Sequence, residues 1–327
     1  MTATVSAPGF LTTVQDTGRT GFRNIGVSHG GALDVHALRV ANLLVGNEPS
    51  AAALEITLGG LRLRFEDRRV VTWCGGAFDV KIGETRLSAG HPAIVESSEQ
   101  LTIERPEIGC RGWLAVSGGI DVPEVLGSRS TDLRAQFGGM DGRQLRVDDV
   151  LRFGPIGPRS DAVLSALATH RVASWFAPAQ WVSPVSRNPI LRVMRGSEWP
   201  RFDPEVRGIL FREPFTVTSQ ADRMGVRLEG PKLHFTGDDL ASEAVSAGAV
   251  QVPPAGHPII LLPDCQTIGG YPKLAHVITV DLPVAAQLRP GDQVQFQLVR
   301  LAEAHELLIE RARQLTVFRA AISLAYQ

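Results

Sequence analysis

Hydrophobic and polar residues alternate along many short segments of this 327-residue chain. In the segment 61–66, leucine or phenylalanine fills every second position, and arginine or glutamate fills the positions between. A period of two places alternate side chains on opposite faces of a β-strand, one towards a core and one towards water. Further apolar runs of strand length lie at 70–73, 113–116, 191–194, 258–262 and 294–299. The pattern predicts a mainly β protein built of barrels or sandwiches rather than a βαβ sheet.

A weak internal repeat divides the chain. The segment 144–153 aligns without a gap to the segment 287–296, and five of the ten positions are identical. A Gly-Gly pair and an Asp-Leu pair precede each copy in the same order. This ordered set indicates two related β-rich halves.

The region between the two copies sets the expected domain boundary, because it is rich in Pro, Ser and Ala and lacks the strand pattern. We expect an N-terminal β domain at 1–160, a linker at 161–189 and a C-terminal β domain at 190–327. The last domain should carry a terminal helix that begins with the pattern at 301–315.

The clearest helix pattern begins at Asp34, a favoured N-cap residue, and ends before Gly46, a typical residue just beyond a helix. Leu38 and Asn42 lie four residues apart on the same face of this helix. We therefore expect Asn42 to be buried and hydrogen-bonded.

Composition and charge exclude several functions. The 33 basic and 34 acidic side chains give a net charge of −1, without the basic excess that nucleic acids or anionic membranes attract. The three cysteines lie far apart, as in proteins of reducing compartments. The first ten residues do not resemble a signal peptide, and no apolar run reaches the ~18 residues that cross a bilayer. We expect a cytoplasmic protein.

Glycine is concentrated in the segment 14–57, the glycine-rich segment, where it permits positive φ and close backbone approach. The glycines expected to shape its loops are Gly18, Gly26, Gly30 and Gly31. Their spacing matches neither the P-loop nor the dinucleotide-binding fingerprint. Tight turns are favoured, and an anion-binding loop is the alternative.

A second cluster of polar residues covers 222–230 and continues with Ser242 and Glu243. Either Arg223 or Arg227 can bind a carboxylate or phosphate through two parallel hydrogen bonds. A surface turn with local Asp and Arg pairs explains the same residues equally well.

The segment 264–273 is the most site-like part of the sequence. A predicted strand ends in polar residues and a Gly-Gly-Tyr-Pro loop follows, which would hold amide, hydroxyl and phenol groups beside a cleft. An ordinary loop between strands is the alternative. The candidate residues are Gln266, Thr267, Gly269, Gly270, Tyr271 and Lys273.

Neither a metal site nor a covalent nucleophile is predicted. The eight histidines are scattered, and none forms an H-E-x-x-H pair. The G-x-S-x-G sequence is absent, and Cys265 has no evident activating partner.

Four ordered blocks make the chain resemble the allophanate hydrolase subunit 2 family. The blocks are 13–47 with 53–60, 127–146, 221–230 and 264–283. That family overlaps with the carboxyltransferase domain of urea carboxylase, the antagonist of the sporulation-kinase inhibitor and one of the subunits of bacterial 5-oxoprolinase, the C subunit. The chain departs from the family pattern at His29, Leu33 and Ala221. These changes bear on loop shape or substrate choice rather than on membership, and a neutral surface replacement explains His29 equally well.

The resemblance implies two cyclophilin-like β-barrel domains with a few short helices, in agreement with the internal repeat. It also implies a smaller subunit 1 type protein as partner, in a heterodimer or a larger assembly. In the 5-oxoprolinase members, the two subunits serve the ATP-dependent activation of 5-oxoproline, and a third protein completes ring opening to glutamate.

The first functional hypothesis is therefore a hydrolase subunit that uses ATP, together with its partner, to activate the cyclic amide of 5-oxoproline. The expected substrate-binding residues are Arg19, Arg223, Gln266, Thr267 and Tyr271. The expected catalytic residues are Asp34, Asp222 and Lys273, where the two aspartates act structurally or as acid and base. The glycine-rich segment would form one wall of a cleft, and the segments 222–230 and 266–273 the other.

Two alternatives remain. One is biotin-dependent carboxyl transfer, as in urea carboxylase; the chain has no Met-Lys-Met sequence, so biotin would arrive on a separate carrier. The other is a regulatory protein without enzymatic activity that sequesters a kinase inhibitor. Amide hydrolysis of the amidase type is not indicated, because no activated serine signature is present.

Overall fold

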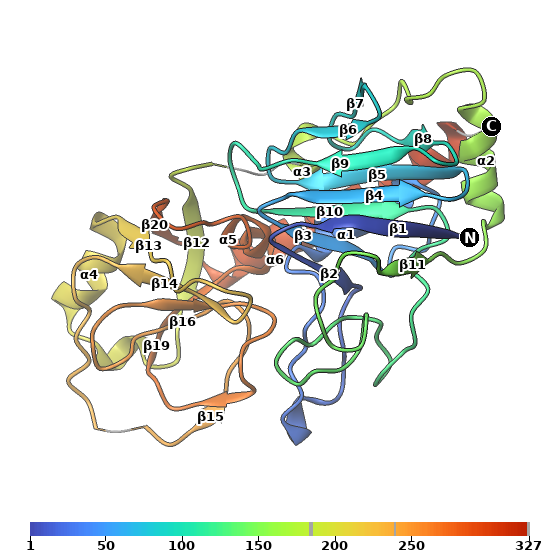
Figure 1. Ribbon diagram of the computed structural model, residues 1–327. Helices are drawn as coiled ribbons and strands as arrows, with labels where there is room; N and C mark the ends of the chain where they lie inside the picture. Colours follow the sequence, from blue (N-terminus) through green and yellow to red (C-terminus); the bar gives the residue numbers. More distant parts are fainter. Residues whose placement is uncertain (183–185, 239, 326–327) are drawn as a thin grey trace. The chain divides into compact units, whose positions relative to one another are not determined.

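The computed structural model describes residues 1–182, 186–238 and 240–325 (Figure 1). The chain forms two compact units. Unit 1 comprises Met1–Arg19, Gly30–Val185 and Gln314–Gln327, and unit 2 comprises Thr20–His29 and Ser186–Arg313. Residues 183–185, within the expected linker, lie outside the described residues.

Two antiparallel sheets form the framework of unit 1 (Figure 1). The strands of the first sheet, in spatial order, are β11 (Val150–Arg152), β1 (Thr2–Pro8), β4 (Leu61–Phe65), β9 (Gln100–Ile103), β6 (Val80–Ile82) and β7 (Thr85–Arg86). Those of the second sheet are β2 (Leu11–Gln15), β3 (Ala53–Thr57), β10 (Arg111–Val116), β5 (Arg69–Gly75) and β8 (Ala93–Val95).

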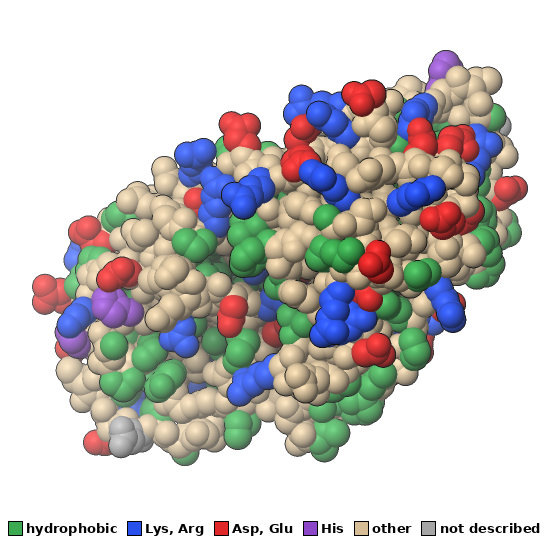
Figure 2. All heavy atoms as spheres, viewed as in Figure 1, with side chains coloured by type: hydrophobic (Ala, Val, Ile, Leu, Met, Phe, Trp, Pro, Cys, Tyr) green, Lys and Arg blue, Asp and Glu red, His purple; other side chains and the backbone are tan. Residues whose placement is uncertain are grey.

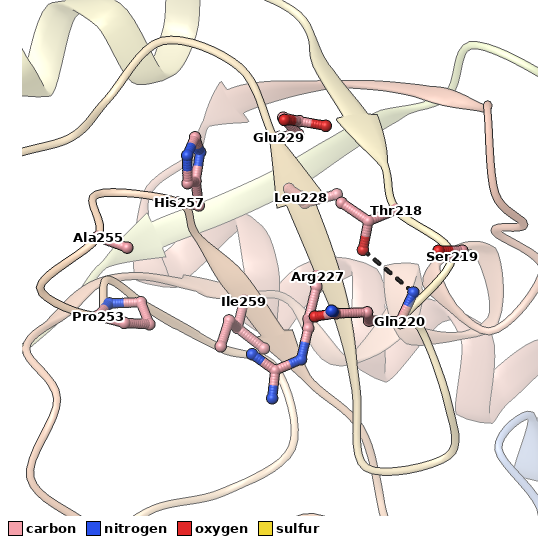
Figure 3. Close-up of a pocket in the computed structure, with 10 residues that line it drawn as sticks. All are labelled: Thr218, Ser219, Gln220, Arg227, Leu228, Glu229, Pro253, Ala255, His257 and Ile259. Carbon is pink, nitrogen blue, oxygen red and sulfur yellow. Dashed lines mark hydrogen bonds between the residues drawn. The ribbon is translucent and has the colours of Figure 1, made fainter.

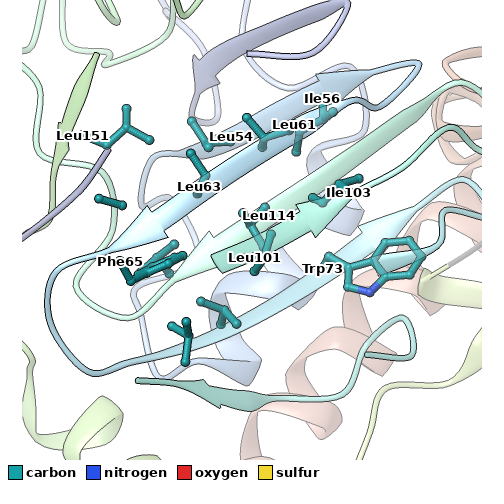
Figure 4. Close-up of a cluster of buried hydrophobic side chains, with 14 of the residues drawn as sticks. Leu54, Ile56, Leu61, Leu63, Phe65, Trp73, Leu101, Ile103, Leu114 and Leu151 are labelled. Carbon is teal, nitrogen blue, oxygen red and sulfur yellow. The ribbon is translucent and has the colours of Figure 1, made fainter. Parts of the chain in front are cut away.

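Side chains from both sheets of unit 1 meet in one hydrophobic core (Figure 4). Leu61, Leu63 and Phe65 of β4 are buried, and the arginines between them are exposed, as the period of two predicted. The strands β5 and β10 are buried along their whole length because α1 (Val35–Leu44) also packs against them. A strand that is covered on both faces has a nearly continuous run of apolar residues in its sequence. This explains why the segments 70–73 and 113–116 are almost entirely apolar.

A closed barrel forms the body of unit 2. Its seven strands in the described part of the chain are β12 (Ile190–Arg195), β19 (Lys273–Val277), β16 (Ala249–Gln251), β17 (Ile259–Leu261), β14 (Gly225–Glu229), β13 (Phe215–Val217) and β20 (Gln293–Leu298). The parallel pair β12 and β20 closes the ring, and the other pairs are antiparallel. A ribbon of β15 (Glu243–Ala244) and β18 (Ile268–Gly269) adds to the barrel. The predicted mainly β class is confirmed.

Helices are few and mostly short. Besides α1, the described residues form α2 (Pro158–Ala166), α3 (Ala179–Val182), α4 (Pro204–Arg212), α5 (Leu282–Ala285), α6 (Leu301–Ala325) and the 3₁₀ turns η1 (Arg23–Ile25), η2 (Trp199–Arg201) and η3 (Thr279–Asp281). The terminal helix α6 extends ten residues beyond the predicted pattern, because neither Gly nor Pro interrupts it. Within the described residues, no helix is both long and apolar enough to cross a membrane.

Candidate functional site in the barrel unit

The two polar clusters of the second half of the sequence lie side by side in unit 2. Arg223 forms two hydrogen bonds with the carboxylate of Asp264, from Nε to Oδ2 at 2.7 Å and from Nη2 to Oδ1 at 3.1 Å. The backbone N–H of Leu262 donates to the carbonyl of Met224 at 2.9 Å. These contacts place the segment 222–230 against the start of the segment 264–273.

The guanidinium group of Arg223 is buried and is already paired with the carboxylate of Asp264. Asp222 is exposed, and its Oδ1 accepts the backbone N–H groups of Met224 at 2.8 Å and Gly225 at 3.1 Å. Both residues fix the turn before β14 in this structure. Their predicted substrate-binding and catalytic roles remain predictions.

The ribbon of β15 and β18 brings a further part of the second cluster to the loop at 264–273. Glu243 pairs with Gly269 across this ribbon. The ammonium group of Lys273 lies between two carboxylates: it pairs with Glu198 at 3.2 Å and donates a short hydrogen bond to Glu243. The backbone N–H of Lys273 also donates to Glu198 Oε2 at 2.7 Å. Lys273 is therefore held by its main chain and its side chain.

The ion pairs decide the protonation states of this group. Burial lowers the pKa of Lys273, but hydrogen bonds and charge from Glu243 and Glu198 outweigh it and raise the pKa above its ordinary value. Burial raises the pKa of Glu198, but hydrogen bonds from Lys273 and Ser197 and the lysine charge hold it below its ordinary value. Lys273 is thus a cation at neutral pH. It can donate hydrogen bonds and stabilise negative charge, whereas a general base would need a lowered pKa.

Two carboxamide groups face Gly269. A Cβ atom on this glycine would lie 3.2 Å from Gln251 Nε2 and 3.4 Å from Gln266 Nε2. Gln251 is 1% exposed, and its Nε2 makes no hydrogen bond within the described part of the chain. A buried amide donor without a partner is costly, so a ligand that reached this donor would satisfy it. We call Glu198, Gln251, Gln266, Gly269 and Lys273 the β18 cluster.

The remaining residues of the predicted loop are less enclosed. Thr267 is half-buried, and its carbonyl accepts the N–H of Val245 at 3.1 Å. Tyr271 is exposed. A Cβ on Gly270 would lie 3.1 Å from the carbonyl of Leu240, so a larger residue would press on the chain there.

Gln251 was missed by the sequence reasoning. It ends the short strand β16, whose three residues are all buried. A single carboxamide at the end of an apolar strand was the available signal, since a buried polar group needs a reason.

Part of the glycine-rich segment, residues 20–29, belongs to unit 2. Gly26 ends the turn η1 with φ of 88°, and Arg23 in that turn donates a short hydrogen bond to the carbonyl of Val245. Arg23 also lies beside Cys265: burial raises the pKa of this thiol, and the guanidinium partly opposes the rise. The segment 20–29 thus packs beside the ribbon of β15 and β18, at Val245 and Cys265.

The rest of the glycine-rich segment belongs to unit 1, where the carboxylate of Asp16 accepts hydrogen bonds within its loop. Asp16 Oδ1 accepts hydrogen bonds from Gly18 N–H at 2.8 Å and from the hydroxyls of Ser128 and Ser130 at 2.6 Å each. Asp16 Oδ2 accepts the N–H of Arg129 at 2.6 Å. A Cβ on Gly31 would lie 2.7 Å from Gly18 N, so the two glycines permit a close backbone approach. This geometry supports the tight-turn interpretation.

Arg19 is 1% exposed and also binds the segment 125–130. Its guanidinium donates to the carbonyls of Val125 and Ser130 and lies 4.5 Å from the ring centre of Phe137. A role in anion binding stays a prediction, because the buried group already holds main-chain oxygens.

The helix α1 begins as predicted. Asp34 Oδ1 accepts the N–H of Ala37 at 2.8 Å, so Asp34 is its N-cap, and Gly46 follows the helix with φ of 77°. Asn42 is fully buried and donates to the carbonyl of Ala51 at 2.7 Å, as expected. A catalytic role of Asp34 stays a prediction.

No metal-binding group of His, Cys, Asp and Glu occurs among the described residues. Basic and acidic side chains are interspersed on the visible face of the protein, without a field of one sign (Figure 2). Such a surface gives no electrostatic support for nucleic-acid binding.

The chain thus combines a mainly β fold, a closed barrel in unit 2 and the polar loop at 264–273. The chain belongs to the carboxyltransferase domain family, subdomains A and B, whose model matches residues 25–298. It is 41% identical over 297 residues to the C subunit of 5-oxoprolinase from Escherichia coli, covering 90% of this chain and 91% of that protein. The corresponding protein of Haemophilus influenzae is 37% identical over 90% of both chains.

Longer fungal proteins contain the same fold. The crystal structure of Kluyveromyces lactis urea carboxylase matches 97% of this chain with a TM-score of 0.88 and 30% identity. The match spans only 29% of that chain, and urea amidolyase of Saccharomyces cerevisiae is matched over 16% of its length. The resemblance found in the sequence is confirmed.

Proposed function

We propose that this chain is a subunit of an ATP-dependent 5-oxoprolinase, which converts 5-oxo-L-proline to L-glutamate together with a subunit 1 type partner and a third subunit. One observation carries the proposal. The chain matches two bacterial proteins that bear the name of the C subunit of 5-oxoprolinase over nine tenths of both lengths, whereas it matches only parts of the fungal proteins.

The β18 cluster has the chemistry for recognising a lactam. The free donor of Gln251 suits the lactam oxygen, and the carboxamide of Gln266 offers both a donor and an acceptor to the ring amide. The Lys273 ammonium suits the substrate carboxylate once the exposed side chain of Glu243 moves aside. ATP bound by the assembled subunits would supply the phosphoryl group that activates the lactam oxygen for ring opening by water.

The β18 cluster does not fit a triphosphate. Lys273 supplies one positive charge, against the several negative charges of a triphosphate, and the chain contains no P-loop. We therefore assign the binding of ATP to the assembled subunits.

The test is reconstitution of this chain with its subunit 1 type partner and the third subunit. We expect glutamate to form from 5-oxoproline only when ATP and all subunits are present. Absence of glutamate from a correctly assembled complex would refute the proposal.

Biotin-dependent carboxyl transfer is the second candidate, favoured by the family and by the fit to urea carboxylase. The carboxamides of the β18 cluster suit urea as well as a lactam, because both present an amide oxygen and N–H groups. Incubation of the same complex with urea and a carboxylated biotin carrier separates the two functions. Transfer of the carboxyl group to urea, without glutamate formation, would establish this alternative.

A further inference from the structure

A cavity of about 400 Å³ opens on the barrel of unit 2, outside the β18 cluster (Figure 3). It lies along β14 and β17, between the turn at 218–220 and the loop at 253–257. Its volume is that of a small-molecule site. Ile259 of this cavity pairs with Gln251 across β17 and β16, so the cavity and the β18 cluster are close neighbours on the barrel.

Two opposite charges stand on the same face of β14. Arg227 and Glu229 are exposed and line the cavity, whereas Leu228 between them is 1% exposed and its side chain belongs to the barrel core. Residues two apart on a strand are separated by about 6.7 Å. In the described part of the chain, neither Arg227 nor Glu229 makes an ion pair. Both charges are therefore available to a ligand.

Polar and apolar groups divide the rest of the lining. The hydroxyl of Thr218 accepts the N–H of Gln220 at 3.3 Å, which orders the turn beside Arg227 (Figure 3). Pro253, Ala255 and Ile259 provide apolar surface on the side of β17. A ligand that fills the cavity would thus present a cation, an anion and an apolar group.

We propose that this cavity binds a zwitterionic α-amino acid with an apolar side chain. Its carboxylate pairs with Arg227, which offers two parallel donors, and its ammonium group pairs with Glu229. The carboxylate and the ammonium group of the ligand are attached to the same carbon atom. Two hydrogen bonds of about 2.8 Å, one to Arg227 and one to Glu229, therefore span the space between the two side chains. The site is independent of the proposed 5-oxoprolinase activity, because none of its charged residues belongs to the β18 cluster.

Isothermal titration calorimetry on the full-length chain tests the proposal with L-leucine as probe. Two analogues serve as controls: 4-methylpentanoate lacks the ammonium group, and 3-methylbutylamine lacks the carboxylate. Partly exposed charge pairs are modest in energy, so we expect each analogue to bind roughly three- to tenfold more weakly than leucine. We expect the same loss for leucine with Arg227→Gln and with Glu229→Gln.

The variant Arg64→Gln is the matched control, because Arg64 is an exposed arginine on a strand of unit 1. It should bind leucine like the original protein. Equal binding of leucine and 4-methylpentanoate, or unchanged binding in Arg227→Gln, would overturn the assignment. Tighter binding of L-glutamate than of L-leucine would overturn the apolar part. Arg227→Gln and Glu229→Gln should melt at the temperature of the original protein, which shows that weaker binding is not caused by a folding defect.

Discussion

At the scale of single residues, the ion pairs around Lys273 tie the stability of the barrel to pH. The pKa of Glu198 is lowered in the folded protein, so its ionised form stabilises the fold at every pH above its unfolded pKa. This stabilisation is lost as the pH falls through the lower, folded value. The pKa of Lys273 is raised, so its contribution is present below its unfolded pKa and is lost in strong alkali, as the pH rises through the folded value.

Glu198→Gln should therefore lower the free energy of unfolding by about 1–3 kcal/mol at pH 7 and reduce its fall between neutral and acid pH. Urea titrations at several pH values measure both quantities. Glu104→Gln is the control, since this side chain is 49% exposed and forms only a long pair with Arg62. An unchanged acid slope in Glu198→Gln would show that Glu198 is not a source of the pH dependence.

Gln251 offers a second prediction, in which stability and activity separate. Its Nε2 is buried without a hydrogen bond, so Gln251→Met removes an unsatisfied donor at nearly constant volume. We expect the free energy of unfolding to stay the same or rise. Turnover of 5-oxoproline by the reconstituted complex should fall roughly tenfold, about 1.4 kcal/mol, if this donor binds the lactam.

Gln144→Met provides the comparison, because Gln144 is an exposed glutamine of unit 1. It should change neither quantity. Full turnover in Gln251→Met would remove this residue from the site.

The contrast between Gln251 and its neighbours shows what the sequence reveals about a site. The polar residues of 264–273 stood out because several adjoin in one loop. Gln251 is a single polar residue in an apolar strand, and its proposed role depends on its proximity to Gly269, 18 positions later in the chain. Likewise, the pairing of Arg223 with Asp264 could not be read from spacing, because strand register decides it.

At the scale of elements, local signals account for what was predicted. The strand β4 alternates because one of its faces meets the core and the other meets water, and α1 has a cap at each end. The length of α6 was underestimated, because most of its residues are exposed and the apolar period is weak. The order of the barrel strands depends on contacts between distant segments, which periodicity does not contain.

The cap of α1 allows the predicted roles of Asp34 to be separated. Asp34→Ala removes the acceptor for Ala37 N–H and should lower the free energy of unfolding by about 1 kcal/mol. Asp34→Asn keeps an acceptor and should restore most of the stability. If the residue acts only as a cap, Asp34→Asn also retains full turnover in the complex. Loss of turnover in a stable Asp34→Asn variant would instead support the catalytic role.

At the scale of the whole molecule, the two units are not consecutive in sequence. Residues 20–29 are part of unit 2, although the rest of that unit starts at 186. Arg23 in this segment bonds Val245 and lies beside Cys265, which is fully buried in the intact protein. A fragment of residues 190–327 therefore lacks the segment 20–29, which packs beside Val245 and Cys265.

We predict that this fragment exposes Cys265. The fragment contains no other cysteine, so reaction with a thiol reagent reports on this residue alone. The thiol should react at least tenfold faster in the fragment than in the full chain carrying Cys74→Ala and Cys110→Ala, because reactivity follows accessibility. A synthetic peptide of residues 20–29 should slow the reaction, and the same peptide with Arg23→Ala should slow it less. A fragment whose thiol stays as unreactive as that of the full chain would show that unit 2 encloses Cys265 without the glycine-rich segment.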